Sequence, residues 1–370
     1  MTPDPAEDSI LQQRAPAVTA EGEAFSSDPR RLRYVTVETP TRGGSVEVGP
    51  GIRWARIPLP IDLNHINVWL IDTSDGCVAV DTGMAASMGK DAWETIAREV
   101  FAKKSLRGVF VTHIHPDHIG LAAWLQERHG VPVIMSKRTF EMASSMLGDD
   151  AKTPFADAER FFRANGLQDV EQLLPMFKPD RFLRMSSGLP RVERFVADAE
   201  VIEWSSQWTA LETNGHAEGH LCLSNSAARV LISGDQVLPT ISSNISFTFR
   251  SNDPNPLDSY LSSLQRLRRL PEDTLVLPSH GVPFYGLQPR IDDLIEHHHE
   301  QLAMAAKVCA EPKSAADLLP LMFRRELKGI HLFLALGEAL AHLEYLVHAG
   351  RVERQTSDGV VRYIKSRNME

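Results

Sequence analysis

The stretch VFVTHIHPDHIG, residues 109–120, places three histidines and one aspartate within six positions, directly behind a short apolar run. Successive helical residues are rotated by about 100°, so His113 and His115 would point to nearly opposite sides of a helix. Both are therefore expected on extended or looping backbone that leaves a strand. The proline at the centre suits the first turn of a following helix. This geometry sends His113 and His115 to one point and turns Asp117 and His118 toward a second point nearby.

Five short apolar runs of the chain end in a residue that can bind a metal. Buried strands that deliver polar groups to one edge are a common way to build a site on a rigid scaffold. One such ending is easily produced by chance, but five are hard to explain by core packing. Imidazoles and carboxylates without thiolates suit Zn²⁺, and also Fe or Mn, in an open catalytic site. The residues at the five ends are Asp81, His113, His216, Asp235 and His280.

The opening stretch contains HIHPDH, which resembles the HxHxDH signature of the metallo-β-lactamase superfamily, whose members include hydroxyacylglutathione hydrolases, lactonases and ribonucleases. Further motifs occur in the family's order: DTG at 81–83, GHAEGH at 215–220, SGD at 233–235 and SHG at 279–281. The resemblance spans about residues 45–285. It implies an α/β fold, the αββα sandwich of this family, with a dinuclear metal centre at one edge.

Carried over residue by residue, the resemblance assigns seven ligands to two divalent metal ions. It implies that one metal is held by His113, His115 and His216, the other by Asp117, His118 and His280, and that Asp235 bridges both. Asp81 and His220 are expected behind the ligands, where they brace them through hydrogen bonds. True β-lactamases of the zinc type often have cysteine where this chain has Asp235, so hydrolysis of antibiotics is disfavoured.

Two such cations would lower the pKa of a bridging water enough to give hydroxide near neutral pH, and would polarise a carbonyl or phosphoryl oxygen. Asp117 is expected to orient that hydroxide and later to carry a proton to the leaving group. The favoured substrate is a small thioester, for example of coenzyme A or glutathione, followed by an ester or lactone. The same ligands serve phosphodiesters, so an RNA endonuclease or phosphodiesterase is the second hypothesis.

Residues outside these motifs give weaker predictions. His65, Ser243 and Asn244 are candidates for contact with the substrate, although a half-buried loop position is favoured for His65. A helical insertion at about residues 139–195 is interpreted as a lid over the pocket, with simple packing as the alternative. The three consecutive histidines at 297–299 point in different directions on a helix, so a solvated helix face is favoured over a metal site.

The chain of 370 residues is expected to have three parts: a flexible polar arm at 1–32, a catalytic domain at 33–300 and a small winged-helix-like domain at 301–370. Helices followed by two β-like runs around a turn suggest the last of these. It holds ten Lys and Arg against eight Asp and Glu, a net charge of +2 that is weak for DNA binding. Packing or homodimerisation is favoured, and a nucleic-acid-binding regulator is the third hypothesis.

Composition narrows the setting further. The formal net charge of −9 argues against general binding to nucleic acids or anionic membranes. No run of 18 or more apolar residues occurs, so no membrane span is expected. The three cysteines are far apart and suggest neither a disulfide framework nor a thiolate zinc site. A cytoplasmic protein fits best.

Overall fold

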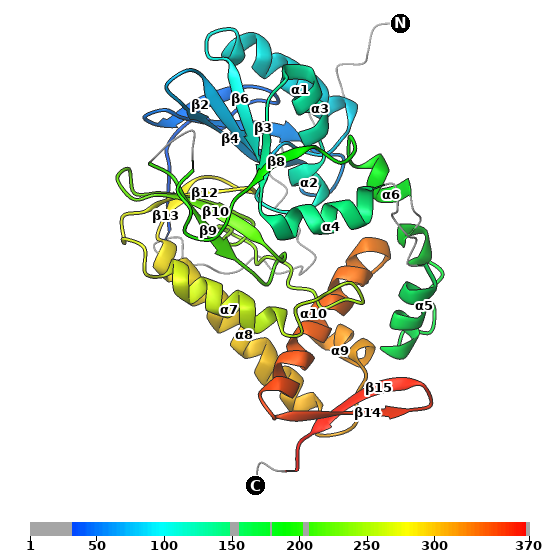
Figure 1. Cartoon of the computed structure of the whole chain (residues 1–370). Helices are drawn as coiled ribbons and strands as arrows, with labels where there is room; N and C mark the ends of the chain where they lie inside the picture. Colours follow the sequence, from blue (N-terminus) through cyan, green and yellow to red (C-terminus); the bar gives the residue numbers. More distant parts are fainter. Residues whose placement is uncertain (1–31, 149–154, 178–179, 203–206, 368–370) are drawn as a thin grey trace, which may run out of the picture.

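The computed structural model of the chain describes residues 32–148, 155–177, 180–202 and 207–367. Apart from Leu32, the predicted N-terminal arm lies outside the described residues. Two sheets form the centre of the fold, and Figure 1 shows them stacked with helices on their outer faces. The mixed α/β sandwich predicted for the chain is confirmed.

A seven-stranded sheet is built from the N-terminal half of the chain, in sequential order from β2 to β8. Its first four strands form an antiparallel meander and the last four are parallel neighbours. The strands are β2 (Ser45–Gly49), β3 (Ile52–Pro58), β4 (His65–Asp72), β5 (Cys77–Val80), β6 (Leu106–Phe110), β7 (Val133–Met135) and β8 (Val192–Phe195). The outer face is covered by α1 (Ser87–Ile96), η1 (Ala97–Phe101), α2 (Pro116–Ile119) and α3 (Ala122–His129).

A six-stranded sheet from the C-terminal half faces it, in the order β1-β13-β12-β11-β10-β9. Its strands are β1 (Arg33–Tyr34), β9 (Thr209–Thr213), β10 (His220–Asn225), β11 (Val230–Gly234), β12 (Leu275–Pro278) and β13 (Phe284–Tyr285). The helices α7 (Pro256–Leu267) and α8 (Leu287–Val308) pack on its outer face. These two helices close the helix–sheet–sheet–helix sandwich.

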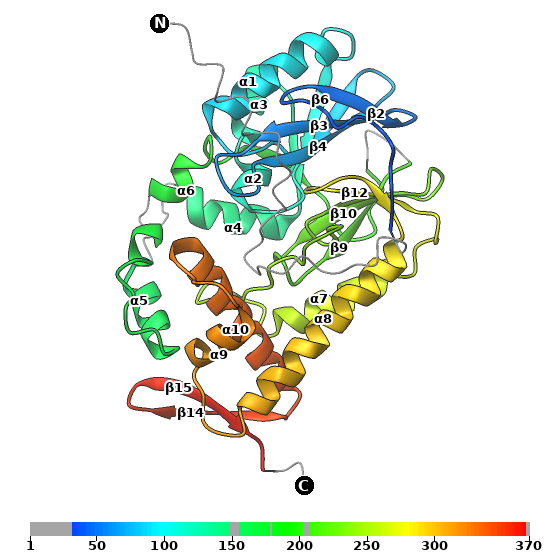
Figure 2. The ribbon, with the colours of Figure 1, turned by 180° about the vertical axis from the view of Figure 1, so that it is seen from behind.

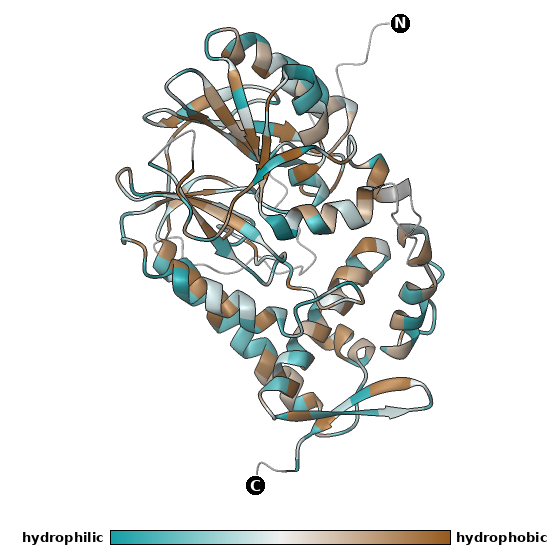
Figure 3. Ribbon diagram, viewed as in Figure 1, coloured by the Kyte–Doolittle hydropathy of each residue, from teal (hydrophilic) through white to brown (hydrophobic). Residues whose placement is uncertain are grey.

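Alternation along the strands explains why both faces of this sheet are apolar. In β10, Leu221 and Leu223 join the core between the two sheets, whereas Cys222 joins the core under α7 and α8. Successive strand residues point to opposite faces, so a strand buried on both sides reads as a continuous apolar run. Hydrophobic segments, brown in Figure 3, accordingly run along strands of both sheets. The core between the sheets includes Trp54 and Trp69, stacked with ring centroids 6.2 Å apart.

The predicted helical insertion consists of α4 (Lys137–Leu147), α5 (Phe155–Ala164), η2 (Leu174–Phe177) and α6 (Asp180–Arg184). Its end differs from the prediction, because β8 occupies the last four residues of the predicted range and pairs with β7 in parallel. The side chains of β8 alternate between half-buried and exposed, so the sequence has no apolar run there. Phe162 and Phe177 contact Phe333, with ring centroids 6.1 and 5.3 Å apart, so the insertion packs against the C-terminal part.

The C-terminal part contains α9 (Ala315–Met322), α10 (Gly329–His348) and a hairpin of β14 (Val352–Ser357) and β15 (Val360–Lys365). It lies at the end of the molecule away from the seven-stranded sheet, as Figures 1 and 2 show. Asp358 and Gly359 form the turn with φ of 53° and 76°, as a two-residue hairpin loop requires. The predicted helices and hairpin are present, while the winged-helix assignment stays a prediction.

Two observations concern the long helices of this part. Helix α8 is continuous across the predicted domain boundary at residue 300, so that boundary stays a prediction. Among the described residues, α10 is the one helix long and apolar enough to cross a membrane, and 67% of its most apolar window is buried inside the fold. A core helix that is apolar on all sides shows the same properties.

The predicted solvated face for the three histidines of α8 is wrong for His298. Its side chain is fully buried, whereas His299 is exposed and His297 lies between these extremes. A step of about 100° per residue turns one of three consecutive side chains inward, in line with Leu294 and Leu302.

Candidate metal centre

The residues predicted as ligands come from loops at one edge of the sandwich. His113 and His115 follow β6, and α2 begins immediately after them at Pro116. His216 lies in the loop between β9 and β10. Asp235 and His280 follow the parallel neighbours β11 and β12, whose carboxyl ends meet at the same sheet edge. The strand ends therefore bring together residues up to 167 positions apart in the chain (280 minus 113).

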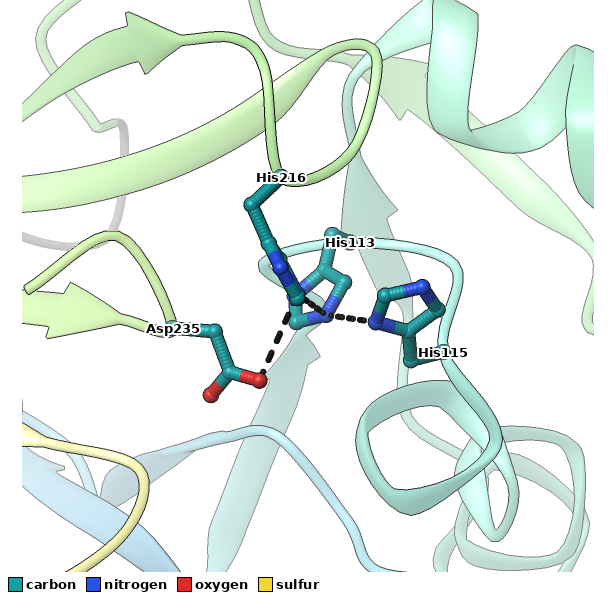
Figure 4. Close-up of side chains that lie close together, drawn as sticks. All are labelled: His113, His115, His216 and Asp235. Carbon is teal, nitrogen blue, oxygen red and sulfur yellow. Dashed lines mark hydrogen bonds and ion pairs between the residues drawn. The ribbon is translucent and has the colours of Figure 1, made fainter. Parts of the chain in front are cut away.

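Four of these side chains form a first group, shown in Figure 4: His113, His115, His216 and Asp235. One nitrogen or carboxylate oxygen from each lies within 4.8 Å of those of the others. His113 Nε2 is 2.9 Å from His115 Nδ1 and 3.3 Å from His216 Nε2. His216 Nε2 is in turn 3.4 Å from Asp235 Oδ2. Three imidazoles and one carboxylate oxygen thus converge on one point.

The second group consists of Asp117, His118 and His280, whose ligand atoms also lie within 4.8 Å of one another. Asp117 Oδ2 is 3.4 Å from His280 Nε2 and 3.8 Å from His118 Nε2. The other oxygen of Asp235, Oδ1, lies 3.4 Å from His118 Nε2 and 3.7 Å from His280 Nε2. Asp235 therefore turns one oxygen to each group.

Unpartnered buried atoms give a test of whether these residues fit metal ions. His118 Nε2, His280 Nε2 and Asp235 Oδ1 are buried and have no hydrogen-bond partner. Leaving a buried polar atom unsatisfied costs about 1–3 kcal/mol, and a bound ligand at such atoms would remove that cost. The donors are imidazole nitrogens and carboxylate oxygens, which suit Zn²⁺, Fe or Mn. The residues present fit a pair of divalent cations.

Polar neighbours fix the orientation of the rings. His118 Nδ1 lies 2.8 Å from Asp81 Oδ2, so its N–H donates there and Nε2 faces the second group. The amide and hydroxyl of Thr112 donate to Asp81 Oδ1 at 2.8 and 3.0 Å. His216 Nδ1 donates to the main-chain oxygen of Asn244 at 2.9 Å, and His280 Nδ1 to that of His65 at 3.0 Å. Such bonds hold the other ring nitrogen toward a metal.

His220 lies behind Asp235. Its Nδ1 is 2.8 Å from the hydroxyl of Thr213, and its Nε2 accepts from the amide of Asp235 at 3.3 Å. Gly234 between them has a φ of 53°, and a Cβ there would lie 2.4 Å from His220 Nε2. The buried imidazole therefore sets the path of the backbone that carries Asp235.

Burial and the neighbouring carboxylates act on the pKa values of the site's imidazoles in opposite directions. Burial lowers the pKa of His113 well below its usual value and that of His115 to about 3, so both carry lone pairs at neutral pH. Burial opposes the charged forms of His118 and His280 as well, but the carboxylates of Asp235 and Asp117 outweigh it and raise both pKa values. At these two nitrogens a cation would take the place of a proton.

The three residues predicted to contact substrate lie around this centre. His65 is half-buried at the start of β4, with its ring 2.6 Å from Asn64 Oδ1. Ser243 is buried and its hydroxyl donates to the main-chain oxygen of Asp235. The Asn244 amide donates to Glu338 Oε2 at 3.0 Å and to the Leu334 carbonyl at 3.3 Å. Ser243 and Asn244 thus brace the site, and their contact with substrate stays a prediction.

Sequence reasoning missed the groups of the site that do not belong to a recognisable motif. The main-chain oxygens of His65 and Asn244 hold the rings of His280 and His216, yet any residue offers a main-chain oxygen. The hydroxyl of Thr112 lies 3.0 Å from His113 Nδ1. The position of Thr112 directly before the histidines was the one available signal. Glu338 contacts the site through Asn244, which lies 94 positions away in the chain. No signal in the sequence indicated that contact.

Comparison with known proteins identifies the family. Residues 61–280 match the model of the Metallo-beta-lactamase superfamily, and residues 302–366 match that of a Metallo-beta-lactamase-like C-terminal domain. A crystal structure of a Beta-lactamase domain protein from Burkholderia ambifaria is 37% identical, with a TM-score of 0.84, over 91% of this chain and 99% of that one.

Two curated relatives are more distant. The probable metallo-hydrolase YqjP of Bacillus subtilis is 24% identical over 79% of this chain and 90% of its own. Acyl-coenzyme A thioesterase MBLAC2 of Gallus gallus is 26% identical over 63% of this chain and 78% of its own. With the sandwich, the converging His and Asp side chains and these matches in place, the chain belongs to the metallo-beta-lactamase superfamily, as a metallo-hydrolase.

Proposed function

We propose that this protein is a dinuclear metal-dependent hydrolase that cleaves a small acyl thioester. The observation that carries the proposal is the position of Asp235, which turns one oxygen toward His216 and the other toward His118 and His280. A carboxylate in that position serves both groups of ligands at once, which favours two metal ions over one. The cation of choice is Zn²⁺, with Fe or Mn as the alternatives.

The seven ligands have the roles that the family motif implies. His113, His115 and His216 would hold one ion, Asp117, His118 and His280 would hold the other, and Asp235 lies between the two groups and would serve both. Asp81, Thr112 and His220 position these ligands through the hydrogen bonds described above. When bound, the ions lower the pKa of water and polarise the carbonyl oxygen of the substrate.

The protein's own contribution to the reaction is centred on Asp117. Its carboxylate is buried beside His118 and His280, and His118 opposes the effect of burial and lowers the pKa of Asp117 to about 2. Asp117 therefore remains ionised at neutral pH, and it is the carboxylate that we assign to take a proton from the attacking water. The water oxygen bonds to the acyl carbon, the carbon–sulfur bond breaks, and the Asp117 carboxyl passes the proton to the leaving sulfur. The products are a carboxylic acid and a thiol.

The choice of a thioester is supported by the relatives and by charge. The Gallus gallus relative is named an acyl-coenzyme A thioesterase. The net charge of −9 disfavours a polyanion such as RNA, whose backbone calls for a strongly basic surface. Esters and lactones share the same acyl chemistry and are the nearest alternatives.

The test measures hydrolysis by Zn²⁺-loaded protein across matched panels of acyl-coenzyme A and acyl-glutathione thioesters, lactones, a β-lactam and short single-stranded RNAs. Asp235→Ala is the inactive variant, and Asp273→Ala, which removes an exposed carboxylate paired with Arg229, is the matched control. Thioester turnover that is lost in Asp235→Ala and kept in Asp273→Ala supports the proposal. Turnover of RNA alone, or thioester turnover that survives Asp235→Ala, refutes it.

A further inference from the structure

A third group of potential metal ligands lies between α8 and α10, formed by residues that have no part in the dinuclear centre. His297 and His298 of α8 and Glu338 of α10 each offer one ligand atom, and these atoms lie within 4.8 Å of one another. The side chain of His298 is fully buried and that of Glu338 is 1% exposed. One imidazole and a carboxylate therefore lie in the interior of a helical layer, with the half-buried imidazole of His297 beside them.

The hydrogen bonds around His298 determine which of its nitrogens is left. His342 Nδ1 lies 2.8 Å from the main-chain oxygen of Glu338, an acceptor only, so it carries the hydrogen of that ring. His342 Nε2 is then a lone pair, and it accepts from His298 Nδ1 at 3.2 Å. His298 Nε2 in turn is a lone pair, buried and without a hydrogen-bond partner.

This arrangement is the one that a metal-binding histidine shows. Such a histidine donates its remaining N–H to a neighbouring acceptor, which fixes the ring and its tautomer. Burial and the adjacent imidazoles hold the pKa of His298 well below its usual value, so the ring is neutral at physiological pH. The surroundings are otherwise apolar and aromatic, with the Tyr260 ring centroid 5.4 Å from that of His298.

We propose that His297, His298 and Glu338 bind a divalent cation, with Zn²⁺ as the ion that two imidazoles and a carboxylate suit best. The ion cross-links α8 to α10 and so joins the C-terminal part to the catalytic sandwich. This site shares no ligand with the dinuclear centre, and its occupancy does not depend on the proposed reaction.

The position of Glu338 connects the new site to the catalytic edge. Its Oε2 accepts from the side-chain amide of Asn244 at 3.0 Å, and the main-chain oxygen of Asn244 accepts from His216 Nδ1 at 2.9 Å. The main chain of the same loop is held by α10, since the amide of Phe247 donates to the Gly337 carbonyl at 2.9 Å. A cation that fixes Glu338 therefore also fixes the support of His216.

The test counts metal ions with the full-length chain. Chelator-treated protein is re-equilibrated with buffered Zn²⁺, and bound zinc is measured by elemental analysis. A variant without the catalytic ligands, His113→Ala/His118→Ala/Asp235→Ala, is expected to keep one equivalent of Zn²⁺, and adding His298→Gln is expected to remove it. Adding His299→Gln instead, at the exposed neighbour on the same helix, leaves the count unchanged.

Two further measurements keep the test decisive if a variant is poorly folded. Circular dichroism and the melting temperature verify the fold of each variant. Glu338→Gln in the wild-type background preserves the shape of the side chain and an acceptor for Asn244, and it is expected to raise the Kd for the α8–α10 ion by more than the roughly 10–100-fold typical of changes outside the ligand set. No zinc in the triple variant, or an unchanged count with His298→Gln, shows that the group is a metal-free hydrogen-bond network and overturns the proposal.

Discussion

The chain contains two histidine-rich segments that the fold treats in opposite ways. In HIHPDH at 113–118 the backbone leaves β6 and enters α2. His113 and His118 are buried and His115 is half-buried, and all three belong to the two ligand groups. In HHH at 297–299 the backbone is a regular helix, which buries His298 and exposes His299. Backbone that leaves a strand end can bring neighbouring residues to one centre, whereas the regular helix buries His298, half-buries His297 and needs Glu338 from another helix to complete the group. The predictions below probe this contrast.

The largest effect is expected at Asp117, the carboxylate that the backbone leaving β6 places beside His280. Asp117→Asn keeps the shape of the side chain but removes the group proposed to move the proton. We expect kcat to fall by about 10²–10⁴-fold, the usual contribution of general acid–base catalysis. Steady-state kinetics on the best thioester measure this, with circular dichroism as the control for folding. A fall of less than tenfold would assign proton transfer to another group.

A smaller effect, on metal affinity, is expected at Asp81, which contacts the predicted ligand His118. Its Oδ2 accepts from His118 Nδ1 at 2.8 Å and orients that ring. Asp81→Asn can turn an amide hydrogen toward His118, so we expect metal affinity to fall by about 10–100-fold. Zinc titration with a competing chromophoric chelator measures the Kd. Asp75→Asn, at an exposed aspartate paired with Arg107, is the matched control and should leave the Kd unchanged.

These two positions also show how far the sequence could predict the site. Asp81 was found because it stands at the end of an apolar run, and Asp117 because it lies within the HIHPDH cluster. The resemblance to a family supported the roles of both. The carbonyls of His65 and Asn244 were missed because a main-chain oxygen is the same in every residue, and Thr112 because its amide and hydroxyl act through Asp81, which lies 31 positions away. The strand β8 was missed because its side chains alternate between half-buried and exposed, which gives no apolar run.

The burial of His298 was missed for a different reason. Its partners His342 and Glu338 are 44 and 40 positions away on another helix (342 and 338 minus 298), and one sequence does not show which helices pack together. The sandwich itself was predictable, since its strands carry both the apolar runs and the motifs. The long-range partners of helical residues could not be predicted from the sequence.

Gly234 offers a test of whether the dinuclear centre depends on the conformation of its backbone. With φ of 53° and a Cβ position 2.4 Å from His220 Nε2, Gly234→Ala brings both strain and a clash next to Asp235. The conformation alone costs about 1–3 kcal/mol. Gly130→Ala is the matched control, because Gly130 has φ of 65° but its added Cβ would meet nothing within 4 Å. Urea unfolding should show the larger loss for Gly234→Ala, and only that variant should also lose bound zinc. Equal losses would mean that the clash is relieved without cost.

The smallest effect on stability is expected at the group of His297, His298 and Glu338. A variant of this group can separate the effect on stability from the effect on metal binding. In chelator-treated protein, His298→Leu removes an unpartnered nitrogen but also the donor to His342 Nε2. The two changes act in opposite directions, so the free energy of unfolding should change by about 1 kcal/mol or less. In Zn²⁺-saturated protein the same variant should be less stable than the wild type, because a ligand that binds only the folded state stabilises it in proportion to RT ln(1 + [L]/Kd). His299→Leu, at the exposed position, should show no such dependence on zinc. If His298→Leu is equally destabilising with and without Zn²⁺, the buried imidazole acts through its contact with His342 alone. The group between α8 and α10 is then a hydrogen-bond network and not a metal site.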